Sequence, residues 1–168
     1  MRKTLDFLYD SAAALAALFM IGLLLMVLLS IVGRQLHFNV PGTDAYAGYL
    51  MAGAGFLALA HTLKRGEHIR VTLIVSSLKP PARRWLERWA MGAGALLAGL
   101  FAFYSVRLVW NSHVFNDIST GNDATALWIP QLAMAIGTVI LAIASIDEFV
   151  LEWRGRVAPQ NNEALRHE

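Results

Sequence analysis

Four long stretches without Asp, Glu, Lys or Arg constrain this chain more than any other feature of its sequence. They run over residues 11–33, 45–63, 89–106 and 124–146. A helix rises about 1.5 Å per residue, so roughly 20 residues cross the ~30 Å hydrocarbon layer of a membrane. Each stretch approaches or exceeds that length. The sequence therefore predicts an all-α integral membrane protein with four transmembrane helices.

The composition supports a single membrane domain. Hydrophobic residues make up 57% of the 168 residues, above the roughly 45–50% of an ordinary globular domain. We expect this domain over residues 1–156 and a polar, disordered tail over 157–168. The expected helices lie at about 11–33, 45–63, 85–107 and 124–152. The first stretch runs into Arg34 without a small-residue cleavage pattern, so we expect a permanent helix rather than a secretory signal.

The basic residues are distributed unevenly among the expected loops. Of the 14 Lys and Arg residues, all but Arg34 and Arg107 precede the first helix, lie between the second and third, or follow the fourth. Loops rich in Lys and Arg stay on the cytoplasmic side of the membrane. We therefore expect both termini and the central loop in the cytoplasm. This asymmetry also accounts for the basic excess, so we expect no nucleic-acid partner.

The segment 66–79 is too charged at its ends to cross a membrane and too apolar for a free loop. We expect a short amphipathic helix there, between the second and third membrane helices and lying in the cytoplasmic interface. Tryptophan and tyrosine commonly anchor helix ends at the membrane surface. The expected anchors are Trp85, Trp89, Trp110, Trp128, Trp153, Tyr46 and Tyr49. Pro130 is expected either to begin the fourth helix or to kink it.

Small residues predict that the second and third helices pack against protein. Gly48 and Ala52 lie four residues apart in the second helix, and Gly92, Gly94 and Gly99 lie in the third. Small side chains let helix backbones approach closely, which drives helix association in lipid. The protein that they face is either this chain or a partner.

Few residues in the expected helices could carry chemistry. The polar ones include Ser30, His61, Gln131, Thr138 and Ser145. A transporter that works alone usually holds an ionisable residue inside the membrane. No Ser/His/acid set, phosphate loop or carboxylate pair is apparent, and the chain has no cysteine. We expect no enzyme, no catalytic residue, no cofactor and no metal site.

Two other interpretations stay open, a self-associating small transporter and a haem-binding anchor of a respiratory complex. Four-helix membrane bundles can hold haem between two histidines, which must meet at one depth. Here His37 and His113 lie outside the expected helices and His61 lies near the end of one. The histidine positions therefore favour neither haem ligation nor any other cofactor.

The run Gly66-Glu67-His68-Ile69-Arg70-Val71 follows the second helix directly. It resembles the Gly-x-His-Ile-Arg-Val run of the small membrane subunit of tripartite ATP-independent periplasmic (TRAP) transporters, the DctQ type. That family also has an Arg closing the first helix, then an outer loop with Pro and an acid opening the second. Arg34, Pro41 and Asp44 match in order and spacing, and Pro130 matches a Pro near the start of the fourth helix. Asp44 is followed by Ala45, where the family often has a second acid.

This resemblance implies a subunit of a secondary transporter of organic acids, driven by an ion gradient that is usually of sodium. In such systems a soluble periplasmic binding protein supplies the substrate. A large multi-span permease holds the substrate and sodium sites. The small subunit is similar to a fixed scaffold for that permease in the bacterial inner membrane.

The residues that we expect to matter lie near helix ends. Arg34 and Asp44 are expected at the outer headgroup level, paired with each other or with the large subunit. Glu67, His68 and Arg70 are expected to fix the turn after the second helix. The expected contacts to membrane phospholipids or the large subunit are Arg70, Lys79, Arg83, Arg84, Trp85 and Trp89. A further hypothesis assigns Asp44, Asp117 and Asp123 to docking of the periplasmic binding protein.

Overall fold

The described part of the chain is entirely helical apart from its connections. The computed structural model describes residues 2–38, 40–64 and 80–153. Its helices are α1 (Arg2–Gln35), α2 (Thr43–Lys64), α4 (Pro80–Val114) and α5 (Trp128–Trp153). These residues contain no strand, only one isolated antiparallel bridge between Ile118 and Ala126. The prediction of an all-α protein is confirmed.

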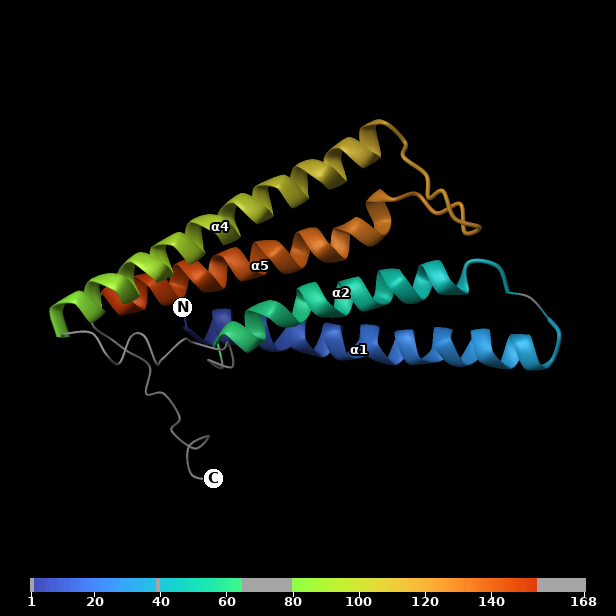
Figure 1. Cartoon of the computed structure of the whole chain (residues 1–168), viewed down its shortest axis with the longest axis horizontal. Coiled ribbons are helices and arrows are strands. Elements are labelled where there is room, and N and C mark those ends of the chain that lie inside the picture. Colours follow the sequence, from blue (N-terminus) through green and yellow to red (C-terminus); the bar gives the residue numbers. More distant parts are fainter. Residues whose placement is uncertain (1, 39, 65–79, 154–168) are drawn as a thin grey trace, which may run out of the picture.

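The four helices lie side by side in the order α1, α2, α5, α4 (Figure 1). α2 packs against α1 and α5, and α5 packs against α4, so that α1 and α4 are the outer helices. The chain runs up and down, which brings the connections 36–42 and 115–127 to one end (Figure 1). We call this the connection end. The starts of α1 and α4 and the ends of α2 and α5 lie at the opposite end.

Three helices are long and apolar enough to cross a membrane. Their candidate spans are Thr4–Gln35, Arg88–Val114 and Trp128–Leu151. α2 has 22 residues and is not among these three candidate spans. A fourth span in α2 stays a prediction. The expected interfacial helix over 66–79 lies outside the described residues.

α1 begins at Arg2 rather than at residue 11, because its first turns pack against the neighbouring helices. Tyr9 and Ala12 are buried in one cluster with Ala60 of α2 and with two residues of α5. The acids of these turns face basic partners on α2: Lys64 Nζ lies 2.7 Å from Asp6 Oδ1. These contacts stabilise the charged first turns of α1, which lie outside the helix predicted from the sequence because of their charges.

The last helix begins at Trp128 rather than at 124. Ala124 has a φ of 47°, and the backbone before Trp128 pairs with the preceding segment, since Ser119 N donates to Thr125 O over 2.8 Å. Pro130 then lies in the first turn of α5. A proline has no N–H, but N–H groups in the first turn have no helical acceptor, so the helix loses nothing there. Pro130 belongs to the start of the helix.

Close approach of backbones holds the centre of the layer together. A Cβ on Gly137 of α5 would lie 2.5 Å from the carbonyl oxygen of Phe56 in α2, and one on Gly53 would meet the ring of Phe19 in α1. The expectation that small residues pack α2 is met at Gly53. Other glycines of α2 and α4 face open space instead. A Cβ would meet nothing within 4 Å at Gly48, Gly55, Gly94 or Gly99.

Candidate functional site at the connection end

Both helices that reach the connection end from the other side finish in the same type of cap. In α1, His37 has a φ of 58° and Phe38 N donates to Gly33 O over 3.0 Å. In α4, Asn116 has a φ of 52° and Asp117 N donates to Ser112 O over 3.0 Å. This is the Schellman arrangement, with one left-handed residue after the helix. It fixes the direction in which each connection leaves its helix.

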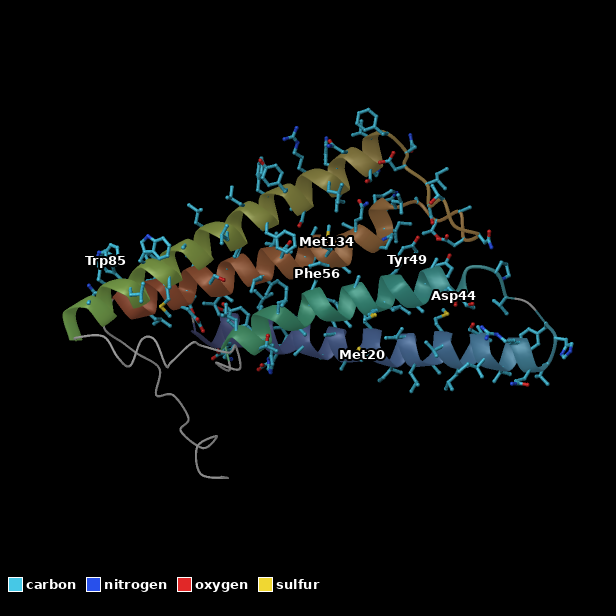
Figure 2. The ribbon with its side chains drawn as sticks, in the orientation of Figure 1. Met20, Asp44, Tyr49, Phe56, Trp85 and Met134 are labelled. Atoms are coloured by element: carbon cyan, nitrogen blue, oxygen red, sulfur yellow. The ribbon has the colours of Figure 1, made fainter. Side chains whose placement is uncertain are left out.

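A group of polar side chains joins α2 to the connection 115–127. The Tyr49 hydroxyl lies 3.0 Å from both Asp123 Oδ2 and Ser119 Oγ, and Ser119 Oγ donates to Asp123 Oδ1 over 2.7 Å. One turn earlier, the Tyr46 hydroxyl lies 3.0 Å from Thr125 Oγ1. We call these five residues the Tyr49 cluster. Figure 2 shows Tyr49 near the start of α2, on the side of the start of α5.

The cluster favours an ionised Asp123. The hydrogen bond to Ser119 above all lowers the pKa of Asp123 from 3.8 to about 2; burial opposes this shift, and the hydrogen bonds to Thr125 and Tyr49 add to it. A carboxylate that accepts several hydrogen bonds holds its charge more strongly than a solvated one. The connection 115–127 is thus fastened to α2 by a charged acceptor.

The two connections also touch each other. Gly42 has a φ of 84°, and a Cβ at this position would lie 2.9 Å from Asp123 Cβ. A residue with a side chain would be strained by the backbone angle and crowded by Asp123. Gly42 therefore lets the connection 36–42 pack closely against the Tyr49 cluster.

A pocket of about 560 Å³ lies between the last turn of α1, the start of α2 and the connection 115–127. Arg34 and Asp44 both line it, together with Ser30, His37 and the Gly121-Asn122 pair. Figure 2 shows Asp44 at the end of α2 that faces the connection 36–42. The structure thus brings Arg34 and Asp44 to one pocket, although no ion pair joins these two described residues.

The opposite end carries contacts between acidic and basic side chains of α1 and α2. Besides Asp6 and Lys64, His61 Nδ1 lies 3.5 Å from Asp10 Oδ1. The Lys64 ammonium also lies over the Tyr9 ring, 5.7 Å from its centroid. These contacts hold the polar first turns of α1 against the end of α2.

The other expected interface residues belong to this end or to the undescribed segment. Trp85 and Trp89 lie in α4 with 69% and 61% of their surface exposed, and Figure 2 shows Trp85 projecting from the helix. Their exposure agrees with the expected contact to lipid without testing it. Arg83 and Arg84 lie in the first turns of α4. Glu67, His68, Arg70 and Lys79 lie outside the described residues.

Sequence reasoning assigned Tyr46 and Tyr49 to the membrane surface and missed the Tyr49 cluster. The hydrogen bonds of Tyr49 reach Ser119 and Asp123, which are 70 and 74 positions away along the chain. No local pattern links residues so distant. The only signal was a tyrosine pair one turn apart near a helix start, which is also typical of an interface anchor.

Comparison with known proteins identifies relatives for most of the chain. The family described as "Tripartite ATP-independent periplasmic transporters, DctQ component" matches residues 23–155. One curated relative, the C4-dicarboxylate TRAP transporter small permease protein DctQ of Rhodobacter capsulatus, is 28% identical over 83 residues. That alignment covers 49% of this chain and 36% of the relative. The chain is therefore matched to about a third of the relative's length.

Proposed function

Because this chain belongs to the DctQ component family of tripartite ATP-independent periplasmic transporters, we propose that it is the small scaffold subunit that supports the large permease of such a transporter. The observation that carries the proposal is the family match over residues 23–155. The transporter would take up organic acids and use an ion gradient, most simply of sodium. The chain is a multi-pass membrane protein of the bacterial inner membrane and a transport component rather than an enzyme.

The arrangement of the helices supports a scaffold rather than a conduit. The described helices form one layer in which each contacts its neighbours (Figure 1), and such a layer does not surround a path across the membrane. Large apolar side chains are exposed on both outer helices, as with Leu24 at 57% and Leu97 at 64%. Lipid or another membrane protein must cover these surfaces.

We assign the contact with the large permease to the outward small residues of α2 and α4. Gly48 and Gly55 lie on one face of α2, and Gly94 lies on α4 in a similarly open environment. Small residues let a partner helix approach closely, and helix interfaces in membranes are enriched in them. This chain uses Gly53 and Gly137 for its own packing, so the open glycines are available to a partner.

The membrane topology in the proposal has four spans, with α2 as the second. The interfacial helix over 66–79 joins α2 to α4 on the cytoplasmic side, and both termini are cytoplasmic. The connection end then faces the periplasm. The distribution of Lys and Arg supports this orientation.

Residues near the cytoplasmic surface have two proposed roles. Glu67, His68 and Arg70 fix the turn after α2, so that His68→Ala should reduce recovery of the large permease. Contacts to phospholipid headgroups are assigned to Lys79, Arg83, Arg84, Trp85 and Trp89. A basic residue near an anionic leaflet contributes about 1 kcal/mol.

At the connection end, we assign Asp117 and Asp123, and Asp44 when it is not engaged by another ligand, to transient docking of the periplasmic binding protein. Asp44 and Asp117 are exposed. Asp123 is already held by Ser119 and Tyr49, so it would act by keeping the surface ordered. Charge reversal at Asp117 that left uptake unchanged would count against this docking role.

Co-purification tests the scaffold assignment. A tagged chain extracted from its native bacterial membrane in mild detergent should bring a large multi-span permease, identified by mass spectrometry. Recovery of a respiratory oxidoreductase with haem absorption, or of the chain alone as an oligomer, would instead favour one of the two other interpretations.

A pair of variants tests the contact surface. Gly55→Leu adds bulk where the chain has open space, so it should reduce recovery of the permease while the chain itself stays folded. Leu24→Phe adds bulk on α1 at a residue that is 57% exposed and should leave recovery unchanged. Equal recovery with both variants would place the interface elsewhere.

A further inference from the structure

The pocket at the connection end presents two opposite charges that do not neutralise each other. Arg34 and Asp44 both line it, and no ion pair joins these described residues. Both side chains are exposed, so each charge can contact a separate group of a bound ligand. Such an arrangement suits a ligand that itself carries both a negative and a positive group.

The pocket lies where an apolar span ends. The candidate membrane span of α1 runs from Thr4 to Gln35, which places Arg34 in its last turn. The end of a span coincides with the headgroup layer of a bilayer. That layer contains lipid phosphates, and a planar guanidinium can bind a phosphate through two parallel hydrogen bonds.

An apolar surface leads from the pocket along α1. Leu29, Phe38 and Val40 line the pocket and keep 37%, 42% and 36% of their surface exposed. Leu25 and Val32 extend this surface on the same face of the helix and are 60% and 45% exposed. A ligand with a charged head and hydrocarbon chains could place its head in the pocket and its chains along the apolar surface of α1.

We propose that this pocket binds the headgroup of a zwitterionic phospholipid, with Arg34 on the phosphate and Asp44 on the ammonium group of ethanolamine. The acyl chains lie along Leu25, Leu29 and Val32. The pocket volume of about 560 Å³ falls within the roughly 300–1,000 Å³ of small-molecule sites. It far exceeds the ~30 Å³ share of one water. The inference depends on the membrane placement of α1 and not on the identity of the partner subunit.

Native mass spectrometry of the full chain, with any subunit that co-purifies, tests the proposal. The purified protein is offered dioleoyl-phosphatidylethanolamine, dioleoyl-phosphatidylglycerol or inorganic phosphate. We expect one tightly held phosphatidylethanolamine. Arg34→Gln should lower the bound fraction about tenfold, the effect of losing one charge-assisted contact. Asp44→Asn should remove the preference for phosphatidylethanolamine over phosphatidylglycerol, because the second lipid has a phosphate but no ammonium group.

The control is Arg107→Gln, which removes the same type of charge from an exposed position of α4 outside the pocket. It should leave lipid retention unchanged. Arg34→Lys keeps the cation, so it should retain more lipid than Arg34→Gln. It also provides a second comparison with the wild type if Arg34→Gln folds poorly. Equal retention in wild type and Arg34→Gln would overturn the proposal. Displacement of the lipid by inorganic phosphate would indicate a simple anion site, and loss of lipid on binding of the large permease would indicate a subunit interface.

Discussion

The hydroxyl of Tyr49 in α2 lies 3.0 Å from the Oδ2 atom of Asp123, although Asp123 follows Tyr49 by 74 positions in the chain. This contact connects the second helix with the segment that joins α4 to α5. Among the described helices, the backbone of α2 approaches that of α5 but not that of α4. The Tyr49–Asp123 hydrogen bond therefore links α2 to the segment that follows α4 at the connection end. The order of that end therefore depends on a few polar side chains.

Replacing Tyr49 with Phe should loosen the connection end. The variant keeps the ring but removes the hydroxyl that reaches Ser119 and Asp123. We expect the Tm of the purified chain to fall by about 2–4 °C, as for one ordinary hydrogen bond in a domain of this size. The matched control is Tyr104→Phe, since Tyr104 is 58% exposed on α4. An equal fall in both variants would show that the cluster adds no stability.

Asp123 should titrate at unusually low pH. Its pKa is lowered from 3.8 to about 2, chiefly by the hydrogen bond to Ser119. The ionised form therefore stabilises the folded state at pH above about 4, and this contribution is lost as the pH falls towards 2. A carboxyl carbon titration by NMR should give a midpoint near 2, and Ser119→Ala should raise it. A midpoint that stays near 4 in the wild type would rule out the charged acceptor.

Gly137→Ala should separate α2 from α5. The added Cβ would lie 2.5 Å from the carbonyl oxygen of Phe56, and backbone atoms on both sides cannot give way as a flexible side chain could. We expect a loss of about 1–3 kcal/mol in the free energy of unfolding, the usual cost of overpacking. Gly55→Ala meets nothing within 4 Å and should change stability by less than about 1 kcal/mol. Denaturant unfolding of both variants in the same detergent makes the comparison.

Single cysteines can test the proposed orientation, because the chain has none of its own. Thr120→Cys lies in the connection 115–127 and should react with a membrane-impermeant maleimide in intact spheroplasts. Gln160→Cys lies in the tail and should react only after the membrane is permeabilised. The opposite pattern would invert the topology, and labelling of both in intact spheroplasts would mean that α5, the helix between these two positions, does not cross the membrane.

Local pattern was sufficient for the helices but not for all their boundaries. Charge-free stretches predicted where each helix has its apolar part, since that property depends only on consecutive residues. The start of α1 at Arg2 could not be predicted from local sequence. Asp6 and Asp10 make the first turns polar, and only the fold brings Lys64 and His61 of α2 close to them. In the same way, the start of α5 at Trp128 depends on backbone pairing with the segment around Ser119.

The sequence by itself determined that this chain is helical, apolar enough for a membrane and similar to the DctQ family, because hydrophobicity, charge and short motifs are properties of adjacent residues. Only the tertiary structure decided the helix order, the division of glycines into packed and open ones, and the grouping of Tyr49 with Asp123. These relationships join residues from separate segments of the chain. They depend on which faces pack together, and that is set by the sum of many weak contacts rather than by any single motif.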